Sequence, residues 1–318
     1  MGNHPFNVIV VVFWLATMSW LMVAKVLPPL RVGEPPSYSS ILKHEIEDPV
    51  CWSVRVNDRE IGWAATRGVR RKDGITELFS RVYLRELPLE EIAPSWLTGV
   101  LRPVLRQLGP LDVDKRSRMT IDPLGRLVGL ESKVRIADVP DAIKVSGQVE
   151  GSALTLNVTS GEVSRKIEQY LPPDALMTDE LSPQAMMPGL RVGQSWTVPL
   201  YSPFRPPTGP MEILQASVER EDKFTWNGKV LNCRVIVFRN DSGSGLMGND
   251  SRGRIWVSEA GLVLCQEITI FRSQVRFYRL PDHSAQELTD SLGPDWMEPL
   301  GAVQARTLLE HLHQADEP

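Results

Sequence analysis

Histidine is scarce in this sequence, and its positions exclude several kinds of catalytic and metal site. The 318 residues include five histidines. They are His4, His44, His283, His311 and His313. All of them fall outside the segments that we predict to be strands. Zinc sites and serine–histidine triads need a histidine on the folded scaffold, so the sequence indicates neither a metal site nor an enzyme of that kind.

Cysteine is equally scarce, with Cys51, Cys233 and Cys265 and no CxxC pair. Three cysteines are too few for a disulfide framework. Cys51 lacks the small-residue context of a lipidated bacterial cysteine, and we expect a half-buried strand thiol there. Cys233 and Cys265 lie on predicted strands separated by a third strand, about 9–10 Å apart. That distance is beyond the reach of a disulfide, so we predict that both thiols are free.

An excess of charge of one sign is also absent. The chain has 35 basic and 39 acidic residues and a net charge of −4, with both signs mixed along it. Nucleic acid binding needs a concentrated basic face, and we therefore expect no nucleic acid partner. The acidic residues are scattered through the turns, so no pair of carboxylates can be selected as a catalytic acid and base.

One glycine motif resembles a cofactor site in its letters. Gly243, Gly245 and Gly248 match the dinucleotide-binding fingerprint, which requires a helix directly after the glycines. The segment that follows, GRIWV, is rich in β-branched and aromatic residues instead. We predict a hairpin loop here and no cofactor.

The one long hydrophobic run covers Phe6 to Ala24 without a charge. Nineteen residues in a helix reach about 28 Å, close to the thickness of a bilayer core. The rival interpretation, a cleaved signal peptide, needs preceding basic residues and a small-residue cleavage site, and neither is evident. We predict a transmembrane anchor in residues 1–26, in contact with the lipid bilayer, and a single-pass membrane protein.

The orientation of that anchor follows from what comes after it. Lys25 and Arg31 weakly favour the cytoplasmic side, but long domains cross a membrane largely regardless of nearby charge. We expect the folded domain to be extracytoplasmic, in the periplasm. Residues 27–48 are rich in proline and predict an extended stalk.

From Val50 onward the hydrophobic pattern has a period of two. Trp52, Val54 and Val56 alternate with polar residues, which is typical of a half-buried antiparallel strand. Similar segments, joined by turns such as Asp73-Gly74, continue to about residue 280. We predict one antiparallel β domain over 49–280, with possible halves at 49–170 and 190–280.

Two segments interrupt the pattern. Leu171 to Leu190 is rich in proline and methionine and predicts a crossing loop or a boundary between the halves. Residues 88–108 have apolar residues at helical spacing, with prolines at positions 94 and 103 that should kink the helix. The residues that could line an apolar ligand site on this helix are Trp96, Leu97, Val100, Leu101, Val104 and Leu105. The fold class is therefore mainly β (α+β): a curved antiparallel sheet or half-barrel packed on a kinked helix and preceded by one transmembrane helix. Residues 281–318 predict a polar tail with a short helix in VQARTLLEHLHQ.

Several short segments resemble a known fold. They are Ile61-Gly62, GLRVGQSWTV, the turn WNGK and the pair GRIWVSEAGLVLCQE. Together they resemble uncharacterised bacterial cell-envelope proteins with the lipoprotein-localisation (LolA/LolB-like) half-barrel fold, over Val50 to Leu280. The resemblance implies a curved antiparallel sheet around a helix, with acyl chains held in the concavity of some members. It transfers no functional residues, and those carriers lack a transmembrane helix.

Two non-catalytic functions are favoured over a third, an enzyme with an unrecognised hydrolase-type site. One is a membrane-tethered, non-catalytic binding module of the cell envelope, holding a lipid or another apolar ligand in the concave sheet. The other is an envelope scaffold or protein-interaction protein with a filled core and no small-molecule ligand. A large apolar cavity would favour the first, whereas a filled core with an exposed apolar patch would favour the second.

Overall fold

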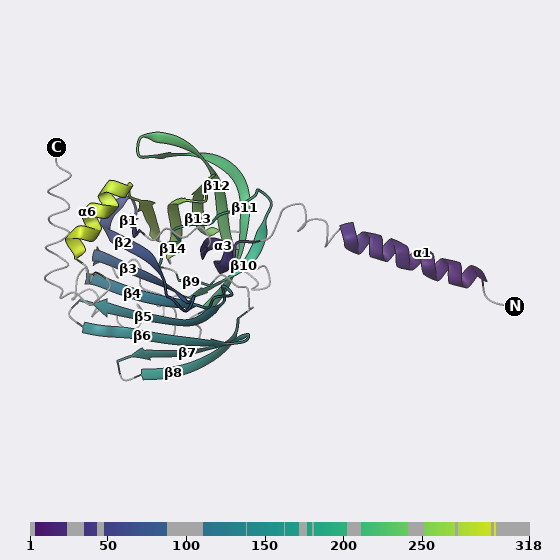
Figure 1. Cartoon of the computed structure of the whole chain (residues 1–318), viewed down its shortest axis with the longest axis horizontal. Helices are drawn as coiled ribbons and strands as arrows, with labels where there is room; N and C mark the ends of the chain where they lie inside the picture. Colours follow the sequence, from purple (N-terminus) through teal and green to yellow (C-terminus); the bar gives the residue numbers. More distant parts are fainter. Residues whose placement is uncertain are drawn as a thin grey trace.

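The computed structural model shows a protein built mainly from β-strands (Figure 1). It describes residues 4–23, 35–42, 48–87, 111–137, 139–161, 163–171, 177–179, 181–201, 211–240, 251–270, 273–293 and 296. The strands are β1 (Val50–Val56), β2 (Arg59–Arg70), β3 (Thr76–Leu87), β4 (Leu111–Ile121), β5 (Leu127–Ile136), β6 (Val139–Glu150), β7 (Ala153–Ser160), β8 (Val163–Tyr170), β9 (Thr178–Asp179), β10 (Ser195–Tyr201), β11 (Met211–Trp226), β12 (Lys229–Asn240), β13 (Ser251–Ser258), β14 (Val263–Ile270) and β15 (Ser273–Arg279). The described helices are α1 (His4–Leu21), α3 (Tyr38–Leu42) and α6 (Asp282–Leu292).

The fifteen strands in the described residues belong to one sheet, in the order β8-β7-β6-β5-β4-β3-β2-β1-β15-β14-β13-β12-β11-β10-β9. Among the described strands, neighbours pair antiparallel except β9 and β10, which are parallel. Strands that follow one another in the sequence pair with each other, except β8 and β9, which lie at opposite edges of the sheet. A further pairing joins β1 to β15, where Trp52 lies opposite Arg279. Two meanders are therefore joined edge to edge, which confirms the predicted antiparallel β fold.

Alternation along each strand sorts the side chains onto two faces of the curved sheet. On β1, Trp52 and Val54 are fully buried in the main core. Cys51 faces the other way, into a smaller cluster with Trp63 and Tyr83. Figure 1 shows α3 inside the curve of the sheet and α6 along its outer side near β1 and β2. Full burial of one large apolar side chain contributes about 1.5–3 kcal/mol, so both faces stabilise the fold.

Helix α6 covers the outer face of the sheet. Its Ala285, Leu288 and Leu292 are buried at helical spacing against the cluster that holds Cys51. The sequence analysis treated everything after residue 280 as a polar tail. It missed this helix because only a few apolar residues mark its buried stripe. The short helix predicted in VQARTLLEHLHQ lies outside the described residues.

The predicted transmembrane anchor is wrong. In the described part of the chain, no helix is both long and apolar enough to cross a membrane. The α-helix that the structure describes in this run ends at Leu21. From Phe6 to Leu21 a helix spans only about 24 Å, short of the roughly 30 Å of a hydrocarbon core. The transmembrane and single-pass assignments are therefore corrected.

Helix α3 lies in the segment that the sequence predicted as an extended stalk. Tyr38 and Leu42 are buried in the main core, and Ile41 packs against it. These positions share one helical face, so a short helix can bury them against the concave sheet. Two other predictions, the kinked helix at 88–108 and the glycine loop at 243–248, lie outside the described residues.

The chain between β8 and β10 passes through the concave side of the sheet. Residues 177–179 and 181–190, called the crossing segment below, connect the strand at one edge with the strands at the other. Met177, Leu181, Met187 and Leu190 of this segment are buried in the main core. The predicted crossing loop in Leu171 to Leu190 agrees with this path, and the segment fills space that an apolar ligand would otherwise occupy.

Candidate functional site: an interior cavity

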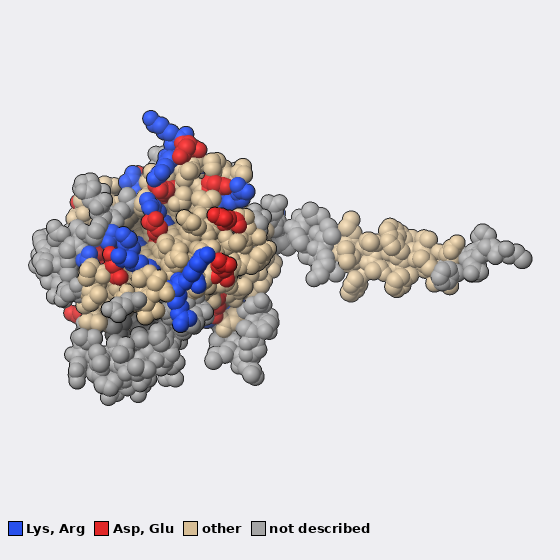
Figure 2. All heavy atoms as spheres, turned by 90° about the horizontal axis from the view of Figure 1, so that it is seen from below, with Lys and Arg blue, Asp and Glu red and all other residues tan. Residues whose placement is uncertain are grey.

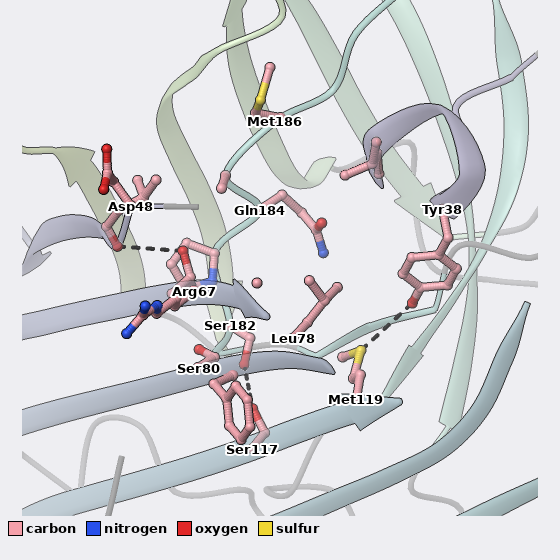
Figure 3. Close-up of a pocket in the computed structure, with 17 residues that line it drawn as sticks. Tyr38, Asp48, Arg67, Leu78, Ser80, Ser117, Met119, Ser182, Gln184 and Met186 are labelled. Carbon is pink, nitrogen blue, oxygen red and sulfur yellow. Dashed lines mark hydrogen bonds between the residues drawn. The ribbon is translucent and has the colours of Figure 1, made fainter. Parts of the chain in front are cut away.

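A cavity of about 90 Å³ lies between β2, β3, β4, α3 and the crossing segment (Figure 3). Its apolar wall is formed by Tyr38, Ile41, Leu78, Phe79, Met119 and Met186. Its polar lining comes from Thr66, Ser80, Ser117, Ser182 and Gln184. Asp48 and Arg67, which are exposed, also line the cavity and mark its solvent side. The cavity therefore has an apolar wall, a hydroxyl-bearing wall and a charged mouth.

Tyr38 fixes α3 to the crossing segment. Its hydroxyl donates a hydrogen bond of 2.6 Å to the carbonyl oxygen of Met177, and it also lies 3.7 Å from Sδ of Met119. Burial raises the pKa of the Tyr38 hydroxyl well above its ordinary value, and this outweighs the opposing effect of its hydrogen bond to Met177. The phenol therefore stays protonated and remains a donor.

The crossing segment is fastened to the other half of the sheet mainly through its backbone. The amide of Gln184 donates to Oε1 of Gln266 at 3.1 Å, and the amide of Met187 donates to the Gly261 carbonyl at 2.8 Å. The carbonyl of Ala185 accepts from Nη1 of Arg279 at 3.0 Å and from the amide of Val263 at 3.2 Å. These bonds fix one wall of the cavity on β14, β15 and the turn before β14.

A buried lysine lies behind the cavity. Nζ of Lys115 on β4 donates to Oγ of Ser182 at 3.0 Å, and Oγ of Ser182 lies 3.1 Å from Oγ of Ser117. Lys115 is only 1% exposed, and both serines are buried. Figure 3 shows Ser182 of the crossing segment directed at Ser117 of β4. A charged side chain in the interior needs polar partners, and the Ser182 hydroxyl supplies one of them.

Four hydroxyl residues form a row across neighbouring strands, called the hydroxyl row below. Thr66 on β2 pairs with Ser80 on β3, Ser80 pairs with Ser117 on β4, and Ser117 pairs with Ser132 on β5. Oγ of Ser80 and Oγ of Ser132 are buried without a hydrogen-bond partner among the described residues. Such groups are rare in native proteins and call for an explanation.

The described residues were compared with what a metal site and a reactive thiol require. No group of three or more His, Cys, Asp or Glu residues there could hold a metal ion. All three cysteines are free and buried, which confirms the free thiols predicted at Cys233 and Cys265. Burial raises the pKa of Cys51 and of Cys265 to about 12, so neither is a reactive thiolate at neutral pH.

The outer surface has a mixed charge pattern. Figure 2 shows basic and acidic side chains interspersed over one face, without a field of one sign. Exposed charges also pair with each other, as Arg118 does with Glu131 at 2.8 Å. The charges on this face therefore indicate no binding site for a partner of one charge sign.

The structure does not test the ligand-lining residues that the sequence predicted. Trp96, Leu97, Val100, Leu101, Val104 and Leu105 lie outside the described residues. The sequence analysis also missed Lys115, Ser117 and Ser182, because it searched for catalytic groups around histidine. A usable signal was present on β4, where Lys115 and Ser117 share the alternation phase of Val113 and Met119. A lysine in the apolar phase of a strand indicates a buried charge with an internal partner.

Fold and cavity together define a curved antiparallel β protein with a small cavity on its concave side. No family model matches this sequence, and no curated protein matches it. Similar solved structures exist. One is a β-barrel-like protein of a domain of unknown function, DUF1849, from Brucella abortus, at 8% identity and a TM-score of 0.42, covering 78% of this chain and 97% of that one.

Two more solved structures are similar over much of the chain. A DUF1089 family protein from Pseudomonas aeruginosa has 16% identity and a TM-score of 0.33, covering 65% of this chain and 89% of that one. The hypothetical lipoprotein YmcC from Escherichia coli has 9% identity and a TM-score of 0.28, covering 74% of this chain and 88% of that one. At such identities and scores, these similarities assign neither a function nor a ligand to this chain.

Proposed function

We propose that this protein is a binding module that holds a small, mostly apolar molecule in the cavity beneath the crossing segment. The observation that carries the proposal is the cavity itself: Ile41, Leu78 and Met119 border an opening of about 90 Å³ on the concave side of the sheet. Binding sites are typically concave and apolar, with a few placed polar groups. The hydroxyls of Ser117 and Ser182 are such groups.

The size of the cavity limits the ligand. An engineered, enclosed cavity of about 150 Å³ in another protein accepts one benzene molecule. This cavity is smaller, but it is open toward Asp48 and Arg67, so a five-membered ring can enter it and extend toward the mouth. Of the two ligand kinds that the sequence analysis named, a compact apolar molecule therefore suits this volume better than a lipid. The cell-envelope location remains a prediction from the sequence resemblance.

Two features support entry and accommodation of a ligand. Asp48 and Arg67 on the solvent side are exposed, so the cavity reaches the surface. Met119 and Met186 line the interior, and unbranched methionine side chains adapt readily to the shape of a ligand. A binding role therefore needs no large movement of the sheet.

The test uses the full chain and methylenecyclopentane, a compact hydrocarbon, with binding followed by ligand-observed NMR. Leu78→Phe places extra volume in the cavity and should weaken binding by about 10-fold or more, since overpacking costs about 1–3 kcal/mol. Leu124→Phe changes a residue that is 70% exposed on a turn and should leave binding unchanged.

Circular dichroism of both variants shows whether the sheet has formed. If the wild-type chain binds no hydrocarbon, or if both variants bind as well as wild type, the binding proposal is wrong. The remaining candidate would then be a scaffold or interaction protein with no small-molecule ligand.

A further inference from the structure

The hydrogen bonds around Ser182 leave one hydroxyl hydrogen unused. Ser117 and Ser182 have one hydroxyl hydrogen each, and a single bond of 3.1 Å between the two oxygens uses only one of them. Lys115, as an ammonium, can donate to Ser182 but cannot accept. Whichever serine donates in the shared bond, the other keeps a hydrogen without an acceptor among the described residues. Both serines line the cavity, so that hydrogen is available to a bound molecule.

A second unused hydroxyl lies beside the first. Ser80 is the register partner of Ser117 on the neighbouring strand and lines the same cavity. Its Oγ is buried and has no partner in the described structure. An unsatisfied buried hydroxyl costs about 1–3 kcal/mol, and a ligand atom that accepts its hydrogen would remove that cost.

We infer that the ligand carries one carbonyl or carboxylate oxygen, which accepts hydrogen bonds from Ser80 and from the Ser117–Ser182 pair. The inference rests on the proposed binding function and specifies its polar contact. A carbonyl oxygen has two lone pairs, which suits two donors on adjacent strands. The apolar remainder of the ligand packs against Ile41, Leu78 and Met119. Lys115 acts through Ser182: it holds the serine as an acceptor, so that the unused hydrogen is directed to the ligand.

The experiment compares cyclopentanone with methylenecyclopentane, which have nearly the same shape and differ in one oxygen. The dissociation constant of each is measured on the full-length wild type and on Ser80→Ala, because the Ser80 hydroxyl has no other hydrogen-bond partner in the described structure. Comparing variants for each ligand separately cancels the difference in hydration between the two ligands. Ser80→Ala should weaken cyclopentanone binding by about five-fold, the effect of one hydrogen bond. It should leave methylenecyclopentane binding unchanged.

Controls separate the hydroxyl from other effects of the substitution. Ser80→Thr retains a hydroxyl and should restore cyclopentanone binding. Ser146→Ala removes an exposed hydroxyl on β6 and should change neither ligand. Butyrate, tested on the same proteins, shows whether a carboxylate oxygen is preferred to a ketone oxygen.

Two outcomes would overturn the inference in distinguishable ways. If wild type binds both ligands and Ser80→Ala weakens neither, the acceptor site is wrong and the binding function stands. If wild type binds neither ligand, both proposals are wrong.

Discussion

Nζ of Lys115 lies 3.0 Å from Oγ of Ser182, joining two residues 67 positions apart in the chain across the concave interior. This contact attaches the crossing segment to the N-terminal half of the sheet, whereas its backbone bonds attach it to the C-terminal half. The segment therefore bridges the two meanders at the cavity.

The first prediction concerns this contact. Ser182→Ala should lower the free energy of unfolding by about 1–3 kcal/mol, because the ammonium of Lys115 loses a buried acceptor. A double-mutant cycle with Lys115→Met, measured by urea denaturation, should give a coupling energy of about 0.5–3 kcal/mol. Ser146→Ala, on the exposed face of β6, should stay within about 0.5 kcal/mol of wild type. A coupling energy of zero would show that the contact does not stabilise the fold.

The second prediction uses two glycines in turns. Gly261 has φ +84°, and an added Cβ would lie 2.9 Å from Cα of Pro188 in the crossing segment. Gly228 has φ +69° with open space around it. Each Gly→Ala change should cost about 1–2 kcal/mol for the left-handed conformation. Gly261→Ala should cost about 1–3 kcal/mol more from the overlap. Equal losses in urea denaturation would mean that the turn and Pro188 are not tightly packed.

The third prediction concerns a buried ion pair on the outer face. Nε and Nη2 of Arg81 contact the carboxylate of Asp114 at 3.0 and 2.7 Å, and both side chains are almost fully buried. Asp114→Asn should destabilise the protein by about 3–5 kcal/mol, because the buried guanidinium of Arg81 loses the carboxylate charge with which it pairs. Glu131→Gln, in an exposed pair with Arg118, should cost at most about 1 kcal/mol. Similar costs for the two changes would contradict the burial of Arg81.

The fourth prediction concerns thiol reactivity. Burial raises the pKa of Cys233 to about 11 and that of Cys51 and Cys265 to about 12. Iodoacetamide should therefore label the native chain slowly near pH 8. Cys233 should react first, and all three thiols should react quickly in urea. Mass spectrometry of the peptides measures the order, and fast labelling of native Cys51 would contradict its burial.

The same shifts make stability depend on pH. The folded state holds the Cys51 proton more tightly than the unfolded state does, because burial raises the pKa of this thiol from 9.0 to about 12. The stabilisation that results is complete below pH 9.0 and is lost as the pH rises toward about 12. Wild type should therefore lose more stability than Cys51→Ala between about pH 9 and pH 11. An equal loss would assign the alkaline transition to other groups.

The alternation of Trp52, Val54 and Val56 was enough to predict the strands and their antiparallel character, because each strand buries one face. The cavity could not be predicted in the same way. The hydroxyl row depends on the register between β2, β3, β4 and β5, and register is set by turns and by packing across strands. Ser182 meets Lys115 only because the crossing segment passes through the interior, and such long-range contacts leave no local pattern in the sequence.

Helix prediction failed for a related reason. The run from Phe6 to Ala24 is apolar along its length, but hydrophobicity does not fix where the α-helix ends. In α6, by contrast, Leu288 and Leu292 form only a weak apolar stripe in the sequence. The helix is buried because it packs against the surface around Trp63 and Tyr83. Local propensity is a weak guide wherever packing partners are distant in sequence.

The junction between β1 and β15 has a consequence for biosynthesis. Until the ribosome has delivered Ser273–Arg279, one side of β1 has no strand beside it, although the N-terminal meander is already complete. A nascent chain emerges at about 5–20 residues per second, so this open edge persists for many seconds with its amide and carbonyl groups unpaired. A chain truncated before Ser273 would keep that edge permanently, and it would depend on chaperones to stay apart from other copies.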